Sequence, residues 1–544
     1  MDGEPAPVGG PRLGLALSGG GHRAAFFHIG VLAALAELGL LRQVRVLSTV
    51  SGGSLIGALY YLHVKTLLET KDDGTITDDD FVEIVHDVAR EYRAAVAKNL
   101  LASTYLNLGK NFAMASRSYT RTDRMGELLE EDYYRQAWHG PLVNGRIPMR
   151  DLLINPGGTA IDPDSEENAG RNAPVPILLL EATCLNTGHN WRFEAEYMGE
   201  PDRQSDAPVE TDVDKNEQLK RAKWDALPEK LRDFPLGAAV AASAAFPPSF
   251  APLPINDLYP GIVVELSDGG IHDNQGVEGL VDRACTHIII SDGSGQMPDV
   301  QQPGTWIPAV LSRASTVYGD VERQQRLLRA FAEKKWAFFH LLSGLPDKTR
   351  EPGGGTVTHP GGMTTADFGV DPAVQQQLAY VRTSLDAFND VEAWGLAKDG
   401  HAIAKYVTPL RPEVQALANP IPLQVDWPWD AVAVAEPDEE LLADLAADGG
   451  KQETLGFYAP LGLMALVVAG LGSWLLYPHG VTLLVLLFAT FVGLGSYFAP
   501  ANRFSAVLFE SVMPAVLAVP LWVASLCMRY VGNRWLTRGR VGAG

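Results

Sequence analysis

Residues 44–54 read VRVLSTVSGGS, an apolar run that ends in Ser51 and two glycines. The run predicts a buried strand at 44–50, and the apolar residues beyond it predict a helix from 54 to about 67. A serine on the sharp turn between them presents its hydroxyl near a helix N-terminus, where the helix dipole favours negative charge. Ser51 is therefore a candidate nucleophile, although Ser and Gly at such a turn also serve as ordinary helix caps.

The turn at Ser51 matches the pattern G-x-S-x-G only in its second half. Thr49 stands where the pattern has its first glycine, whereas Gly53 supplies the second. Small residues after the serine let the turn close. The pattern by itself is a weak signal, so other parts of the chain have to support it.

A second strand–turn–helix unit precedes the first. A strand is expected at 12–17, followed by Gly19, Gly20 and Gly21 and by a helix at 23–38. Two such units in succession imply a parallel sheet flanked by helices. Farther along the chain, long helices are expected at about 309–342 and 373–397. Consecutive glycines that open a helix also expose backbone N–H groups, which suit an anion or a developing oxyanion.

The glycine loop has a competing interpretation. Gly19-x-Gly21-x-x-Ala24 matches part of a dinucleotide-binding fingerprint. That function requires a carboxylate at the end of the second strand to bind the ribose, and residues 49–51 contain none. A Gly-Lys-Ser/Thr motif is also absent, which excludes a nucleoside triphosphate loop. The loop therefore indicates an oxyanion site more strongly than a nucleotide site or a merely structural glycine turn.

A third turn motif, Asp268-Gly269-Gly270, follows an expected strand at 262–266. Asp-Gly on its own is ordinary turn chemistry. The combination is more informative, because all three motifs follow predicted parallel strands. The carboxyl ends of such strands meet at one edge of the sheet, where ligands bind in open α/β folds.

Several stretches share the order and spacing of one known family. They are Gly19-Gly20-Gly21-x-Arg23, Val50-Ser51-Gly52-Gly53-Ser54, Glu181-Ala182-Thr183, Asn186-Thr187-Gly188, the stretch ASAAFPP at 242–248, and Asp268-Gly269-Gly270. Together they resemble the ordered blocks of patatin-like phospholipases, over roughly residues 12–410. The resemblance implies an α/β fold: a three-layer α/β/α hydrolase domain with a mainly parallel sheet.

The resemblance also implies roles for individual residues. Ser51 attacks an acyl ester carbonyl, and Asp268 takes the serine proton and later activates water, a Ser–Asp dyad. The N–H groups of the glycine loop stabilise the oxyanion. Arg23 orients that loop or faces a lipid phosphate. The oxyanion residues are Gly19, Gly20 and Gly21, and the supporting residues are Arg23, Gly53, Gly269 and Gly270.

A Ser–His–Asp triad is the mechanistic alternative, and its usual chain order places a histidine after the aspartate. Each histidine is interpreted first as a loop or surface residue. The candidates are His272, His287, His340, His359 and His401, with His28 on the first helix. No cofactor or metal is expected. The acidic stretch at 162–168 resembles a calcium loop in charge only, because it lacks the glycine and the spaced bidentate carboxylate.

The composition excludes some classes of protein. A formal net charge of −21 argues against a nucleic-acid partner, since phosphate binding requires clustered Lys and Arg. Only Cys184, Cys285 and Cys527 occur, which fits a reducing compartment and no disulfide framework. Residues 1–11 have neither a basic flank nor an apolar run. We therefore expect a disordered N-terminus, no signal peptide and a cytoplasmic catalytic domain.

The end of the chain changes abruptly in character. Residues 455–477 and 481–501 contain no charge and are long enough to cross a bilayer, whereas 504–528 is interrupted by Glu510 and two prolines. A buried apolar bundle is the alternative. We predict C-terminal transmembrane helices and a multi-pass membrane protein. The expected organisation is a hydrolase domain at 12–410, an acidic linker at 411–454, two to three membrane segments at 455–528 and a basic tail at 529–544.

The sequence thus predicts a membrane-anchored serine lipid acyl hydrolase of the phospholipase A or lysophospholipase type. Its expected partners are a membrane lipid substrate and the membrane itself. Two alternatives use the same fold: a catalytically idle lipid-binding scaffold, and an acyltransferase with the same nucleophile. The presence of both Ser51 and Asp268 disfavours the scaffold. Product analysis with an added acceptor separates the acyltransferase from the hydrolase.

Overall fold

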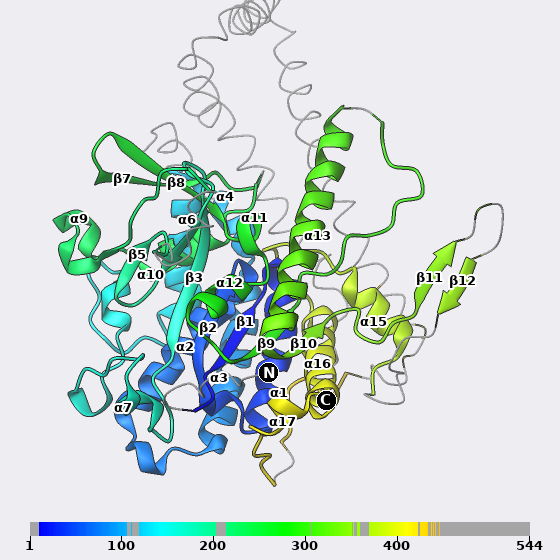
Figure 1. Ribbon diagram of the computed structural model, residues 1–544, viewed down its shortest axis with the longest axis horizontal. Coiled ribbons are helices and arrows are strands. Elements are labelled where there is room, and N and C mark those ends of the chain that lie inside the picture. The colour runs from blue at the N-terminus through cyan, green and yellow to red at the C-terminus, as the bar shows by residue number, and fades with distance from the viewer. Residues whose placement is uncertain are drawn as a thin grey trace, which may run out of the picture.

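The computed structural model describes residues 10–445, apart from several short gaps. The undescribed positions in this span are 106–109, 111–118, 203–213, 248, 306, 351, 353–355, 360–368, 423–424, 433–436, 438, 440 and 442–444. The described elements form one large mixed sheet with helices on both faces (Figure 1), and β11 (Asp347–Arg350) pairs with β12 (Thr356–His359) in a separate hairpin.

Five parallel strands form one side of the large sheet, from the edge strand β10 inward, in the order β10-β9-β1-β2-β3. Every residue of β1, β2, β3 and β9 is buried, because helices cover both faces of a parallel sheet. This burial explains why these strands appear in the sequence as nearly continuous apolar runs. The five are β1 (Leu13–Leu17), β2 (Val44–Val50), β3 (Ile177–Cys184), β9 (His287–Asp292) and β10 (Lys335–His340).

Side chains alternate between the two faces of the sheet, and each face has its own core. Leu15 and Leu47 belong to the larger core, whereas their neighbours Ala16 and Val46 belong to the smaller one. The larger core lies under α1 (Gly21–Glu37), α2 (Gly52–Thr70), α3 (Asp78–Val96) and α16 (Asp390–Val407), and the smaller under α12 (Val277–Asp282) and α13 (Ile307–Glu333).

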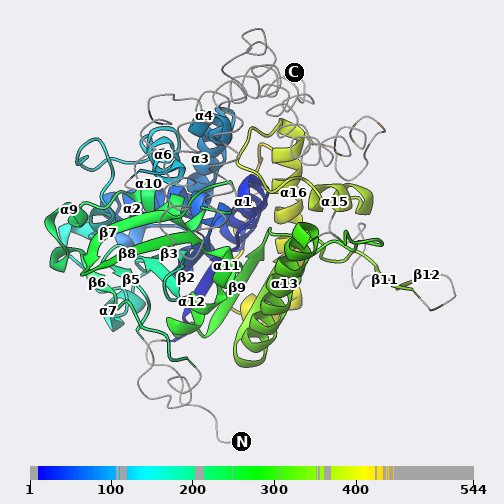
Figure 2. The same cartoon turned by 90° about the horizontal axis from the view of Figure 1, so that it is seen from above.

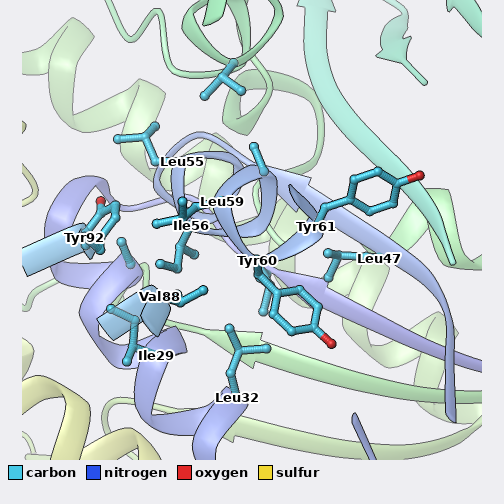
Figure 3. Packing of buried hydrophobic residues seen from close by; sticks show 14 of the residues in the cluster. Ile29, Leu32, Leu47, Leu55, Ile56, Leu59, Tyr60, Tyr61, Val88 and Tyr92 are labelled. Carbon is cyan, nitrogen blue, oxygen red and sulfur yellow. The ribbon is translucent and has the colours of Figure 1, made fainter. Parts of the chain in front are cut away.

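Figure 2 shows these two helix layers on either side of the strands, and Figure 3 shows side chains of α1, α2 and α3 meeting in the larger core. The predicted three-layer α/β/α arrangement with a mainly parallel sheet is confirmed. The remaining helices are α4 (Leu100–Tyr105), α6 (Arg121–Leu129), α7 (Glu166–Ala169), α9 (Glu229–Arg232), α10 (Leu236–Ser243), α11 (Gly270–Asp273), α15 (Pro372–Ala379) and α17 (Pro412–Gln415).

Beyond β3 the sheet becomes antiparallel. The strands there are β4 (Asn190–Phe193), β5 (Tyr197–Gly199), β6 (Ala222–Lys223), β7 (Leu253–Tyr259) and β8 (Ile262–Asp268). β8 pairs antiparallel with β3 and with its hairpin partner β7. The expectation that Asp268 ends a parallel strand was therefore wrong, because a hairpin reverses the chain before β8.

Two predicted long helices were also wrong in extent. A single helix was expected at 309–342, but α13 ends at Glu333 and the chain continues as β10. The residues of β10 pair in parallel with β9, so tertiary pairing overrides the helical pattern there. A second helix was expected at 373–397, where the structure has α15 and then α16, whose N-cap is Asn389.

The prediction of a multi-pass membrane protein with C-terminal transmembrane helices requires correction. Within the residues that the structure describes, none of the helices combines the length and the apolar composition that a bilayer crossing requires. The predicted segments at 455–528 lie outside the described residues. The physical reason for the correction is that an apolar run of bilayer length is necessary for a spanning helix but not sufficient, because burial against protein selects the same composition.

A buried carboxyl in α16 provides a test of the fold. Asp399 is fully buried, and neither of its carboxylate oxygens has a hydrogen-bond partner among the described residues. Burial raises the pKa of Asp399 well above its ordinary value. The folded chain thus binds a proton that the unfolded chain releases, so stability falls as pH rises above about 4, the unfolded pKa of Asp.

We expect Asp399→Asn to unfold at a higher temperature than the wild type at pH 8, and to lose this advantage near pH 4. Thermal denaturation across this pH range measures the difference. Asp299→Asn, at an exposed aspartate, is the control and is expected to follow the wild type. A constant offset between Asp399→Asn and the wild type at every pH contradicts the prediction.

Candidate active site

Ser51 lies at the turn between β2 and α2, and its backbone has φ 50°, a positive value for a residue other than glycine. The two glycines that follow allow the turn to approach the first unit closely. An ideal Cβ on Gly52 would lie 2.2 Å from the Gly21 carbonyl oxygen, and one on Gly53 would lie 2.1 Å from the Leu17 carbonyl oxygen. Both contacts are too short for any side chain, so these positions require glycine.

The glycine loop lies directly beside Ser51. An ideal Cβ on Gly19 would be 3.2 Å from the Ser51 Cβ. Gly20 and Gly21 have φ 137° and 58°, values that glycine adopts readily. The Gly19 N–H donates to the Asn274 carbonyl oxygen (2.9 Å) and is already used. The N–H groups of Gly20 and Gly21 have no acceptor in the described part of the chain, so these two remain available to an oxyanion.

The register of β3 brings Asp268 to Ser51. Val50, the last residue of β2, pairs with Glu181, and Asp268, the last residue of β8, pairs with the next residue, Ala182. Because β4 occupies the other edge of β3 at Ala182, β8 continues the edge that β2 leaves. The two strands therefore meet end to end, and the residues that terminate them come together.

Asp268 is buried, with a relative exposure of 3%. One carboxylate oxygen, Oδ1, accepts a hydrogen bond from the Gly270 N–H (2.8 Å). Burial raises the pKa of Asp268 to about 6, against the lowering effects of the Gly270 N–H and of a hydrogen bond from the Ser51 side chain. The second oxygen, Oδ2, is buried and has no other partner among the described residues. An ionised Asp268 can thus accept a proton from Ser51.

The glycines after Asp268 are held tightly. An ideal Cβ on Gly269 would lie 2.3 Å from the Glu181 carbonyl oxygen, so the turn packs against the backbone of β3. An ideal Cβ on Gly270 would lie 2.5 Å from Asn274 Oδ1 and 2.9 Å from Asp268 Oδ1. Both glycines give the carboxylate room next to the neighbouring loop.

Arg23 is buried and binds only backbone among the described residues. Its Nε donates to the Gly293 carbonyl (3.3 Å), and Nη1 donates to the Ala379 and Val381 carbonyls (3.0 and 2.9 Å). Nη2 donates to the Ser294 carbonyl. Burial lowers the pKa of Arg23 to about 10, so it stays charged at neutral pH. Arg23 thus joins the first turn of α1 to the backbone at 293–294 and at 379–381.

The histidines of the alternative triad bond elsewhere. No histidine in the described part of the chain forms a hydrogen bond with Ser51 or Asp268. Their partners are Glu278 for His272, Thr286 for His287, the Leu342 N–H for His340, Thr349 for His359, Glu37 for His401, and Ser18 and Ser291 for His28. Among the described residues, the group that hydrogen-bonds with the Ser51 side chain at this site is therefore a carboxylate and not an imidazole.

The acidic stretch at 162–168 shows no calcium geometry. Asp164 pairs with Arg12 and with Arg283, and Asp162 accepts a hydrogen bond from the Asp164 N–H (2.9 Å). Over the described ranges no group of three or more His, Cys, Asp or Glu side chains is arranged to hold a metal ion.

Two residues of the site had no role assigned from the sequence. Ser243, at the end of α10, accepts a hydrogen bond from the Ser51 N–H (3.0 Å). Asn274 follows α11 and accepts the Gly19 N–H. Ser243 lies in the ASAAFPP stretch, so the resemblance marked its position but not its contact. Nothing in the sequence alone distinguishes Asn274.

Comparisons with known proteins matched this chain to one family model and to several solved structures. A family model described as patatin-like phospholipase matches residues 15–281, a range that contains the glycine loop, Ser51 and Asp268. This part of the chain belongs to the patatin-like phospholipase family. The family that the sequence motifs resembled is thus confirmed for the patatin-like domain. A search of curated proteins found no match to this chain.

Several solved structures match this chain at low identity. The human GIVD cytosolic phospholipase A2, in complex with methyl gamma-linolenyl fluorophosphonate and terbium chloride, is 13% identical, with a TM-score of 0.39, and 77% of this chain matches 61% of that one. VipD from Legionella pneumophila is 13% identical, with a TM-score of 0.26. The match covers 98% of this chain and 92% of VipD. The chain thus spans about three fifths of the human structure, and TM-scores this low carry no functional argument.

Proposed function

We propose that the chain is a serine lipid acyl hydrolase that cleaves carboxylic ester bonds of phospholipids or lysophospholipids through Ser51 and Asp268. The observation that carries the proposal is the end-to-end meeting of β2 and β8 on β3, which sets Ser51 beside a buried carboxylate. The match of residues 15–281 to a phospholipase family supports the substrate class and an enzyme of the carboxylic ester hydrolase kind.

In the first half of the reaction, ionised Asp268 takes the Ser51 hydroxyl proton while the serine oxygen attacks the ester carbonyl. The carbonyl oxygen of the tetrahedral intermediate carries negative charge, and the N–H groups of Gly20 and Gly21 are available to it. Collapse of the intermediate breaks the ester C–O bond. The leaving alcohol takes the proton back from Asp268, and the acyl group stays on Ser51.

In the second half, Asp268 takes a proton from water, and the hydroxide attacks the acyl-enzyme carbonyl. Breakdown of this intermediate releases the fatty acid and returns the proton to the Ser51 oxygen. One ester and one water are consumed, and one alcohol and one fatty acid are formed. The pKa of about 6 for Asp268 suits both halves, because a base whose pKa lies near the working pH both accepts and returns protons efficiently.

The experiment that tests this function measures fatty-acid release from mixed phospholipid vesicles by the purified full-length chain, with and without a divalent-cation chelator. We expect release that the chelator does not change. Addition of a lysophospholipid acceptor separates the products of hydrolysis from those of acyl transfer. A chain that releases no fatty acid from phospholipid or lysophospholipid overturns the proposal, and label found mainly on the acceptor replaces it with an acyltransferase.

A further inference from the structure

We infer that Ser243 is a positioning residue for the reaction: its side chain holds the Ser51 turn while its backbone holds the Asp268 turn. One residue of α10 thereby fixes the nucleophile and the base relative to each other. The inference rests on the proposed function for its catalytic consequence, whereas the contacts themselves are independent of that function.

Three hydroxyl groups form a hydrogen-bonded row between the backbone of Ser51 and strand β3. The Ser51 N–H lies 3.0 Å from Ser243 Oγ, and Ser243 Oγ lies 2.8 Å from Ser54 Oγ. Ser54 Oγ donates to Thr49 Oγ1 (3.0 Å), which in turn donates to the Leu179 carbonyl oxygen (2.9 Å). Ser54, Thr49 and Ser243 are fully buried, so these bonds have no competition from solvent.

Which hydroxyl donates in each bond of the row follows from counting protons, since each hydroxyl has one proton to donate. Thr49 gives its proton to the carbonyl of Leu179, and Ser54 gives its own to Thr49. The bond between Ser54 and Ser243 must therefore use the proton of Ser243. Ser243 Oγ is then left with lone pairs only, and it accepts the Ser51 N–H. Each donor in the row of hydroxyl groups is thus used once.

The row of hydroxyl groups explains why Thr49 stands where the G-x-S-x-G pattern has glycine. Ser51 has φ 50° and needs support from its surroundings to remain in this conformation. Thr49, where the pattern has glycine, contributes a hydroxyl that anchors the row on β3 through Leu179. The row ends at the backbone N–H of Ser51, which Ser243 Oγ accepts. A threonine here therefore stabilises the turn in a way that glycine cannot.

Backbone groups of Ser243 and Ala245 bind the turn at Asp268. The Ser243 carbonyl oxygen accepts the Gly269 N–H (3.1 Å), and the Ala245 carbonyl oxygen accepts the Asp268 N–H (3.2 Å). The hydroxyl of Ser267 also donates to the Ala245 carbonyl (3.0 Å). Residues 243–245 therefore bind both turns of the site, although Ser51 and Ser243 are 192 positions apart in the chain.

If Ser243 only stabilises the fold, its loss should affect activity no more than the loss of another buried serine hydroxyl. Ser243→Ala removes the side-chain bond to Ser51 and keeps the backbone bonds to the Asp268 turn. The matched control is Ser48→Ala, which deletes another buried serine hydroxyl three residues before Ser51, one that donates to Glu181 (3.2 Å) and does not touch the turn.

We expect Ser243→Ala to lower kcat by about 10- to 100-fold with KM nearly unchanged, because a small displacement of a nucleophile costs rate and not binding. Ser48→Ala is expected to keep kcat within about 2-fold, and Ser243→Thr, which restores a hydroxyl, to recover part of the rate. A fluorophosphonate probe reacts with activated serines. It should label Ser243→Ala more slowly than Ser48→Ala, by the same factor that separates their kcat values.

Equal kcat and equal labelling rates for Ser243→Ala and Ser48→Ala overturn the positioning role, whatever their stabilities. A double-mutant cycle of unfolding free energies for Ser243→Ala and Ser54→Ala tests the hydroxyl row without reference to activity, and purely additive effects exclude the row. A wild-type chain that neither releases fatty acid nor takes up the probe overturns the proposed function instead.

Discussion

Replacing Ser51 with alanine is expected to lower fatty-acid release by at least about 10³-fold while the chain remains folded. The hydroxyl oxygen is the atom that becomes acylated in the proposed reaction, and Ser51 is the residue whose side chain hydrogen-bonds to Asp268. The fold should tolerate the change, because the bond that holds the turn runs from the Ser51 backbone N–H to Ser243 and not from the side chain.

The measurement is a vesicle assay with wild type, Ser51→Ala and Ser48→Ala, together with the melting temperature of each. Intact mass after incubation with a fluorophosphonate should show one adduct on the wild type and on Ser48→Ala, and none on Ser51→Ala. Substantial release by a folded Ser51→Ala chain contradicts the assignment of Ser51 as nucleophile. An adduct that persists in Ser51→Ala points to a different serine.

Replacing Asp268 with asparagine is expected to lower kcat by about 10²- to 10⁴-fold, the usual contribution of a positioned general base. Asparagine keeps the size of the side chain and can still accept the Gly270 N–H through its carbonyl oxygen, so the turn should stay in place. It cannot take a proton from Ser51. Activity of the asparagine variant close to the wild-type level excludes Asp268 as the base.

The wild type should show the corresponding pH dependence. Asp268 must be ionised to accept a proton, so kcat/KM should rise with pH and reach half its maximum near pH 6, the pKa that burial gives this carboxyl. The residual activity of Asp268→Asn should lack this step. The pH dependence is measured as kcat/KM from pH 4.5 to 8, on vesicles whose headgroups do not titrate in this range. A flat wild-type profile contradicts the proposed role of Asp268.

The sequence predicted the parallel strands and the two turns at the glycine loop and Ser51 because these are local features. A run of apolar residues that ends in small ones specifies a buried strand followed by a tight turn, whatever lies elsewhere. The same local reasoning was wrong about 309–342, where a strand follows the helix, because pairing of β10 with β9 is a long-range contact. It was wrong again about the direction of β8, which depends on a hairpin partner.

The candidate site was predicted as a set of residues whose turns meet at one edge of the sheet, without the contacts between them. Ser51 and Asp268 stood out from their turns and from the resemblance, but their juxtaposition depends on the register along β3. The role of Arg23 could not be chosen from the sequence either, since it depends on carbonyl groups at 293–294 and 379–381. Neither the partner of the Gly19 N–H nor that of the Ser51 N–H lies within its own turn.

By itself, then, the sequence determined the α/β class, the family and the chemical character of the reactive side chains, because periodicity, small residues and acidic groups are properties of short segments. Only the tertiary structure decided which amides stay available for an oxyanion, where Asp268 meets Ser51, and how residues 243–245 join the two turns. These properties depend on atoms brought within hydrogen-bonding distance from far apart in the chain, and such distances exist only once the sheet has formed.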